Sequence, residues 1–159
     1  MHWTYIAAAG RTGRMDDERM AKALRFEALH QREQPLLLPN PWDAGSARLL
    51  AHLGFEALGT TSLGLANSVG RRRPEREEIL ENCRAIAAAT SLPVTADLEN
   101  GFGDSPEEAA QAIAAAWACG AVGGSIEDGT YAPGAPVYEL SLAVEQVADQ
   151  RDADLVIVG

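Results

Sequence analysis

Five short apolar segments recur along the chain, and a stretch with helical spacing separates each from the next. The segments are residues 36–39, 57–61, 93–99, 122–127 and 155–158. Most of them are unbroken apolar runs without polar alternation, which is typical of strands buried on both faces of a parallel sheet. Between them, apolar residues lie three and four positions apart, as in helices that cover such a sheet. The pattern therefore predicts an α/β fold.

Local signals place the ends of the helices. Asp43 and Ser105 are suited to N-cap positions, and Pro74 suits a first helical turn. Gly54 and Gly120 suit the positions just after helices end. The expected helices are residues 16–32, 43–53, 74–90, 105–120 and 140–150.

Polar and acidic residues follow four of the expected strands. They are Asn40 to Asp43, Thr60 to Ser62, Asp97 to Glu99, and Glu127 with Asp128. In a (β/α)8 barrel the carboxyl ends of the strands meet at one mouth, whereas in an open sheet they spread along an edge. The TIM-barrel type of α/β fold therefore explains the pattern better. Residues 16–159 supply about five of the eight βα units, so we expect a partial barrel domain preceded by a disordered extension at residues 1–15.

Composition limits the classes of partner. The formal net charge is −10, which argues against nucleic acid and anionic membrane surfaces, since both attract clustered Lys and Arg. The basic run Arg71 to Arg73 is followed at once by acids and is interpreted as an exposed loop. No apolar segment approaches the roughly 18 residues needed to cross a membrane, and none resembles a secretory signal. We expect a cytoplasmic protein.

The cysteines and histidines do not indicate a metal site. Cys83 and Cys119 lie inside apolar helical patterns without CxxC spacing, so we expect buried thiols in a reducing compartment. The three histidines lie far along the chain from the acidic strand ends, which argues against a His-based metal site.

Two neighbouring strands are expected to end in carboxylates. Asp97 and Glu99 close one strand, and Glu127 follows the next. Residues two apart on a strand share a face, so Asp97 and Glu99 would face the barrel interior while Leu98 faces the helices. Mg2+ keeps several waters and needs only one or two direct carboxylates. The pattern predicts a metal site; the alternative is a set of solvated acids at a strand end.

Four motifs together resemble the isocitrate lyase/phosphoenolpyruvate mutase family. They are LPNPWDAGSAR at 38–48, GFEALGTTS at 54–62, DLENGFG at 97–103 and GSIED at 124–128. Their order and spacing match over roughly residues 35–147. The resemblance implies a (β/α)8 barrel of the phosphoenolpyruvate/pyruvate-domain-like type that binds Mg2+, or Mn2+ as the alternative ion. It also implies chemistry on C–C or P–C bonds of small 2-oxo acids.

The resemblance implies roles for particular residues. Asp97 matches the direct metal ligand, Glu99 matches a second acid that holds the metal through water, and Glu127 matches the acid after the fourth strand. A short loop matches the segment whose backbone N–H groups receive the carboxylate or phosphonate of the substrate: Thr61, Ser62 and Leu63.

The expected activity is Mg2+-dependent lyase or hydrolase chemistry on a C–C bond of a small 2-oxo acid or dicarboxylate, through an enolate. The alternative within the enzymes is a phosphoenolpyruvate or phosphonopyruvate mutase or hydrolase. The alternative of another class is a catalytically silent truncated barrel that is stable only on self-association. Because exposed strand edges drive association, we expect a homo-oligomer.

Three segments depart from the family pattern. Residues 129–136 lack the Lys-Lys-Cys-Gly-His sequence of the lyases, so the sequence identifies no general acid. Residues 70–74 lack the aspartate of the mutases. The last apolar segment, residues 155–158, lacks the arginine with which relatives clamp their substrate. These departures predict that turnover by this chain alone is impaired.

Overall fold

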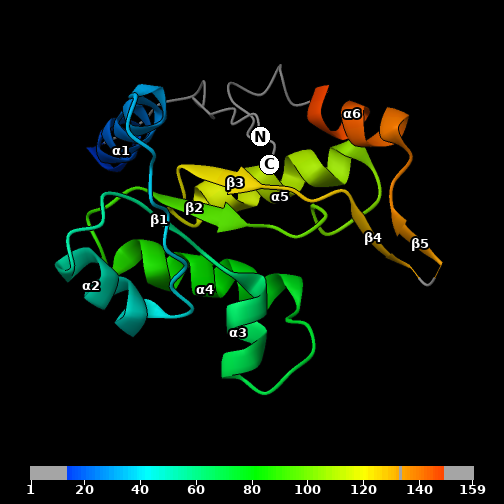
Figure 1. Ribbon diagram of the computed structural model, residues 1–159, viewed down its shortest axis with the longest axis horizontal. Coiled ribbons are helices and arrows are strands. Elements are labelled where there is room, and N and C mark those ends of the chain that lie inside the picture. The colour runs from blue at the N-terminus through cyan, green and yellow to red at the C-terminus, as the bar shows by residue number, and fades with distance from the viewer. Residues whose placement is uncertain (1–13, 133, 149–159) are drawn as a thin grey trace.

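The computed structural model describes residues 14–132 and 134–148. Helices and strands alternate through most of this range (Figure 1). In chain order they are α1 (Arg14–Gln31), α2 (Ala44–His52), β1 (Leu58–Gly59), α3 (Ser62–Ser68), α4 (Arg76–Ala88), β2 (Val94–Asp97), α5 (Pro106–Ala118), β3 (Gly123–Ser125), β4 (Gly129–Ala132), β5 (Ala135–Val137) and α6 (Leu140–Ala148).

A parallel sheet with the strand order β1-β2-β3 lies at the centre of the described chain (Figure 1). Leu58 of β1 is in register with Val94 of β2, and Asp97 of β2 is in register with Ser125 of β3. Parallel neighbours need long crossover connections. Here the crossovers contain α3 and α4 between β1 and β2, and α5 between β2 and β3. The predicted α/β fold with a parallel sheet is confirmed.

Helices α4 and α5 cover one face of the sheet. Ala96 and Leu98 are fully buried in one cluster with Cys83 of α4 and Ile113 of α5. Val94 belongs to the adjoining cluster formed with α2 and α4. Because alternate residues of a strand share a face, Val94, Ala96 and Leu98 together form the helix-facing side of the central strand. The prediction that Leu98 faces the helices is correct.

Helix α1 packs near the amino ends of the strands. Its buried residues Ala23, Phe26 and Leu29 lie in one cluster with Ala57 and Val122. These last two residues immediately precede β1 and β3. The carboxyl ends of the strands, where the acids lie, are therefore at the other edge of the sheet.

The expected first strand at residues 36–39 is not formed. The segment still lies beside β1, because the N–H of Gly59 donates to the carbonyl of Pro39 at 3.0 Å and the side-chain amide of Asn40 donates to the carbonyl of Gly59 at 3.0 Å. Pro39 and Pro41 carry no N–H, so the segment cannot donate a regular ladder of hydrogen bonds.

Other expectations differ from the structure in detail or fall outside it. Helix α3 and the antiparallel hairpin β4–β5 were not predicted. Residues 1–13 of the expected extension and the expected strand at 155–158 lie outside the described residues, and α1 begins at Arg14. Among the described residues, no helix combines the length and the hydropathy that a membrane crossing needs.

We predict that Leu98→Ala lowers the free energy of unfolding by about 2–5 kcal/mol, because it leaves a cavity at a fully buried position of the core. Urea denaturation followed by circular dichroism measures the change. Leu49→Ala on α2 is the matched control, since that side chain is 58% exposed and its loss should cost no more than about 0.5 kcal/mol. Equal losses for the two variants would contradict the packing described here.

Candidate functional site

Asp97 is the last residue of β2, and the start of α3 holds its carboxylate. The backbone N–H and the hydroxyl of Ser62 both donate to Oδ2 of Asp97, each at 2.8 Å. The N–H of Glu99 donates to the other oxygen, Oδ1, at 3.1 Å. The N–H of Asp97 itself donates to the hydroxyl oxygen of Thr60 at 2.9 Å. Together these contacts fix the orientation of a half-buried carboxylate at the carboxyl end of the central strand.

Glu99 lies beyond the end of β2, in a left-handed backbone conformation with φ of 52°. The expected strand over 93–99 therefore ends two residues early, at Asp97, and alternation along a strand does not set the direction of Glu99. Its side chain is buried and paired with Arg73, whose Nε and Nη2 lie 2.7 and 2.6 Å from Oε2 of Glu99. Arg73 belongs to the run interpreted as an exposed loop, and nothing in the sequence pattern indicated this contact.

The turn after Glu99 packs tightly against α5. Gly101 has φ of 80°, and a Cβ atom there would come within 2.9 Å of the Cα of Ala109. Only glycine meets both the backbone and the steric requirement. The close approach holds the acidic segment of the chain against the helix that follows it.

A backbone hydrogen bond holds Glu127 beside Glu99. Its N–H donates to the carbonyl of Glu99 at 2.6 Å, while the residue itself is exposed. The chain segments that carry Asp97, Glu99 and Glu127 are thus neighbours. Within the described ranges, however, no group of three or more His, Cys, Asp or Glu side chains is arranged so that it could hold a metal ion.

The donor set suits a hydrated ion better than a closed cage of side chains. A hard ion such as Mg2+ keeps several waters and takes oxygen ligands, often only one or two carboxylates. Asp97 offers one fixed, half-buried carboxylate for this purpose. Glu99 and Glu127 lie on neighbouring chain segments, joined by a backbone hydrogen bond, but an arginine already neutralises Glu99.

The predicted substrate loop is the first turn of α3. Thr61 is its N-cap, and its side chain accepts a hydrogen bond from the N–H of Gly64 at 3.1 Å. Ser62 donates to Asp97, so the loop and the proposed metal ligand are in direct contact. Leu63 is exposed. The sequence predicted that these residues lie near the acids, but it did not reveal the Ser62 contact.

Asp43, which the sequence marked as an N-cap candidate, acts as a helix cap. Its carboxylate accepts from the N–H of Ser46 at 2.6 Å, in a capping box at the start of α2. The hydrogen bond from the Ser46 backbone, followed by that from the Ser46 hydroxyl, lowers the pKa of the Asp43 carboxyl.

A further polar contact joins the loop after β2 to the segment before α6. The side-chain amide of the buried residue Asn100 donates to the hydroxyl of Tyr138 at 2.9 Å, and that hydroxyl donates to Asp104. Burial, and then the hydrogen bond to Asp104, raises the pKa of Tyr138. These partners are more than 30 residues apart in sequence, and no local pattern signals their contact.

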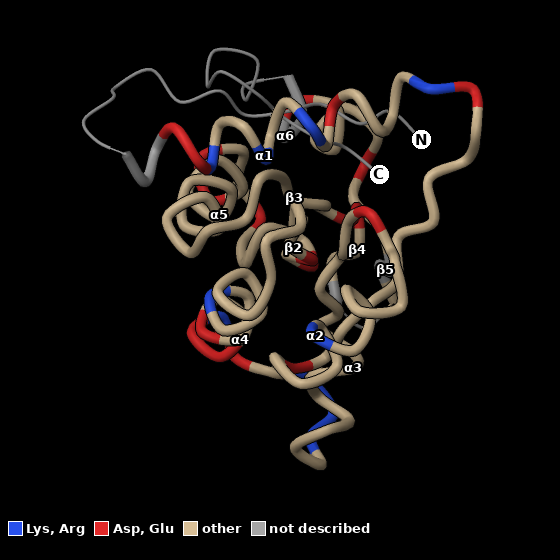
Figure 2. The backbone as a smooth tube through the Cα atoms, turned by 90° about the vertical axis from the view of Figure 1, so that its left-hand side faces the viewer, with Lys and Arg blue, Asp and Glu red and all other residues tan. Residues whose placement is uncertain are grey.

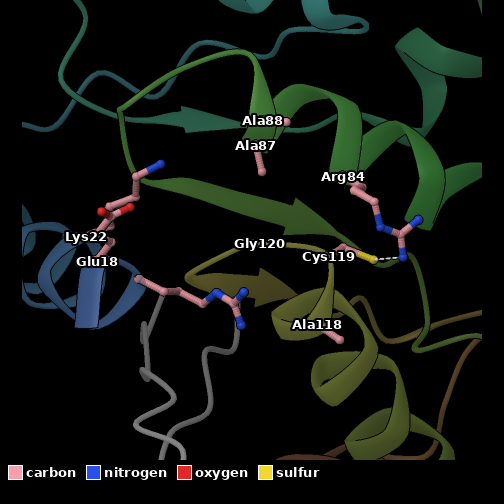
Figure 3. Close-up of a pocket in the computed structure, with 9 residues that line it drawn as sticks. Glu18, Lys22, Arg84, Ala87, Ala88, Ala118, Cys119 and Gly120 are labelled. Atoms are coloured by element: carbon pink, nitrogen blue, oxygen red, sulfur yellow. Dashed lines mark hydrogen bonds between the residues drawn. The ribbon is translucent and has the colours of Figure 1, made fainter. Parts of the chain in front are cut away.

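A cavity lies at the opposite edge of the sheet from this site (Figure 3). Its volume is about 330 Å³, and its lining includes Ala87, Ala88 and Gly120, which precede β2 and β3. At its edge, Nη2 of Arg84 donates to Sγ of Cys119 at 3.3 Å. The cavity is therefore separate from the acidic edge of the sheet.

Residues 26–158 match the sequence model of the phosphoenolpyruvate phosphomutase family. The chain belongs to this family. One solved structure similar to this chain is a putative lyase/mutase from Burkholderia cenocepacia J2315. It is 49% identical to this chain with a TM-score of 0.83, over 86% of this chain and 50% of that one.

Two further solved structures with the same fold have named activities of their own. One is 2,3-dimethylmalate lyase, described as a PEP mutase/isocitrate lyase superfamily member, with 25% identity and a TM-score of 0.72 over 86% of this chain and 48% of that one. The other is a phosphonopyruvate hydrolase solved with oxalate and Mg2+, with 23% identity and a TM-score of 0.74 over the same shares, which shows the common fold.

The chain is short compared with its relatives. It spans about half the length of these solved structures. An uncharacterized protein of Mycobacterium tuberculosis is 37% identical over 93 residues, which are 57% of this chain and 36% of that protein. The family match over residues 26–158 includes the acids at the ends of β2 and β3.

The two cysteines should differ in reactivity. Burial, and then the neighbouring Cys119, raises the pKa of the Cys83 thiol to about 12, and the thiolate is the reactive form. We expect iodoacetamide at pH 8 to leave Cys83 unmodified in the native protein and to modify it in urea, as read by mass spectrometry. Cys119, which lines the cavity, should react first. Equal rates for both thiols in the native protein would contradict this assignment.

Proposed function

We propose that this chain carries the metal- and substrate-binding part of a Mg2+-dependent enzyme that breaks a C–C bond of a small 2-oxo acid or dicarboxylate. The observation that carries the proposal is the fixed carboxylate of Asp97, bound by Ser62 at the carboxyl end of the central strand. The named lyase among the solved relatives supports a C–C bond as the reacting bond. The hydrolase solved with oxalate and Mg2+ supports a divalent ion beside a small carboxylate.

In this proposal Asp97 would bind Mg2+ directly, and Glu99 and Glu127 would hold it through water. The bound ion would supply positive charge to the enolate left when a C–C bond breaks. Thr61 and Leu63 would receive the anionic end of the substrate beside Asp97, because the N–H of Ser62 already donates to the Asp97 carboxylate. Ser62 would orient the Asp97 carboxylate through its two hydrogen bonds.

The charge of the molecule is compatible with a small substrate that arrives with a metal ion. Basic residues form short, scattered segments among the more numerous acidic ones (Figure 2). The net charge of −10 does not favour nucleic acid as a partner. We propose a small carboxylate as the partner.

A phosphoenolpyruvate or phosphonopyruvate mutase or hydrolase is the second candidate. The family that matches residues 26–158 is named for phosphoenolpyruvate phosphomutase, which supports this alternative. Incubation of the chain with phosphonopyruvate, followed by 31P NMR, separates P–C chemistry from C–C cleavage.

We predict that Asp97→Asn lowers Mg2+-dependent cleavage at least about 100-fold, because it removes the charge of the direct ligand. Release of products from oxaloacetate, methylisocitrate and 2,3-dimethylmalate, read by proton NMR against enzyme-free samples, measures the effect. Asp17→Asn, a change at an exposed position of α1, is the control with the same chemistry. Wild-type activity in Asp97→Asn would contradict the assignment, provided that circular dichroism shows both variants to be folded.

We also expect the chain to form a homo-oligomer, because β3 is an edge of the described sheet and exposed edges drive association. Light scattering after size exclusion, with and without Mg2+, measures its mass. A folded oligomer that binds the metal supports the enzyme. Aggregates on which the metal has no effect favour the silent, truncated barrel instead.

A further inference from the structure

Arg73 reaches across the acidic edge of the sheet from the loop between α3 and α4. Its Nε and Nη2 both contact one oxygen of Glu99, Oε2, at 2.7 and 2.6 Å. The Glu99 side chain is only 6% exposed, whereas that of Arg73 is 45% exposed. The guanidinium is therefore the partner that remains in contact with water, and the carboxylate is the partner that is buried.

A buried carboxylate needs a compensating charge. Removal of water from a charged group is costly unless an opposite charge and hydrogen bonds replace it. The guanidinium of Arg73 supplies the opposite charge, and its two N–H groups supply the hydrogen bonds. The strained, left-handed backbone of Glu99 and its carbonyl contact with the N–H of Glu127 hold the acid in this position.

A divalent ion bound at Asp97 would offer the same compensation to Glu99. The backbone N–H of Glu99 donates to Oδ1 of Asp97 at 3.1 Å, so a direct hydrogen bond holds the main chain of Glu99 beside the Asp97 carboxylate. An ion beside Asp97 would repel the guanidinium if both stayed close to Glu99, because like charges a few ångströms apart repel strongly away from bulk water.

We propose that Arg73 is an internal counter-ion that competes with the divalent cation for Glu99 and so sets the metal affinity of the site. The inference rests on the proposed function, because it takes Asp97 and Glu99 as the metal-binding acids. In the metal-free chain the guanidinium neutralises Glu99. Metal binding displaces it toward solvent, which its partial exposure allows.

The test is the affinity for Mn2+, measured by electron paramagnetic resonance on the full chain. Arg73→Gln removes the counter-ion, and Arg72→Gln is the matched control, because Arg72 is an exposed neighbour in the same loop. The control accounts for the general gain in cation affinity when one positive charge is lost. We expect Arg73→Gln to bind Mn2+ at least about ten-fold tighter than Arg72→Gln.

A stability measurement provides a second readout. Without metal, Arg73→Gln should melt at a lower temperature than wild type, since Glu99 loses its partner. Saturating Mn2+ should raise its melting temperature by more than it raises that of wild type. Arg73→Lys keeps the charge but not the two-N–H contact. It should bind Mn2+ with intermediate affinity, and it serves as the test if Arg73→Gln does not fold.

The outcomes separate this inference from the proposed function. Equal Mn2+ affinities for Arg73→Gln and Arg72→Gln would overturn the counter-ion role. If Asp97→Asn abolishes Mn2+ binding in the same experiment, the metal site itself still stands. Failure of wild type and all the arginine variants to bind Mn2+ would overturn the metal-dependent function itself, and the competition at Glu99 with it.

Discussion

The acidic site depends on the parallel register of the central strand. Asp97 of β2 lies opposite Ser125 of β3, and the N–H of Thr60 donates to the carbonyl of Thr95 at 2.9 Å. This pairing places Gly59, the last residue of β1, beside Thr95, two residues before the end of β2. The chain then turns directly into α3, so that Ser62 meets the Asp97 carboxylate. A shift of the register by one residue would turn Asp97 toward the helices and separate these groups.

The two acids after β2 are stabilised in different ways because they are buried to different extents. Asp97 is half-buried and accepts hydrogen bonds from neutral donors, the N–H and hydroxyl of Ser62 and the N–H of Glu99. Glu99 is almost fully buried and is paired with a full positive charge on Arg73. Neutral donors leave the negative charge of Asp97 available to a cation, whereas the charge of Glu99 is already balanced. The two acids therefore differ in how much negative charge each can offer to a cation.

The sequence predicted those features that repeat or follow one another locally. Unbroken apolar runs predicted β1, β2 and β3, and the caps at Asp43 and Ser105 predicted the starts of α2 and α5. The early end of β2 was not predictable from alternation, because Glu99 takes a left-handed conformation there and its side chain pairs with Arg73, 26 positions earlier. The same reason applies to the Ser62 contact with Asp97, which joins residues 35 positions apart. Periodicity carries no information about which loops meet.

The arginine run shows how composition can hide a specific interaction. The sequence does not distinguish Arg71, Arg72 and Arg73 from one another, and it favours an exposed loop for all of them. In the structure, Arg71 pairs with Glu78 where both side chains are well exposed, and such pairs contribute at most about 1 kcal/mol. Arg73 pairs instead with an acid that is nearly free of solvent, where the loss of one partner leaves a costly unpaired charge. Burial of the partner therefore decides which arginine matters to the site, and burial is set by the packing of the turn after β2 against α5.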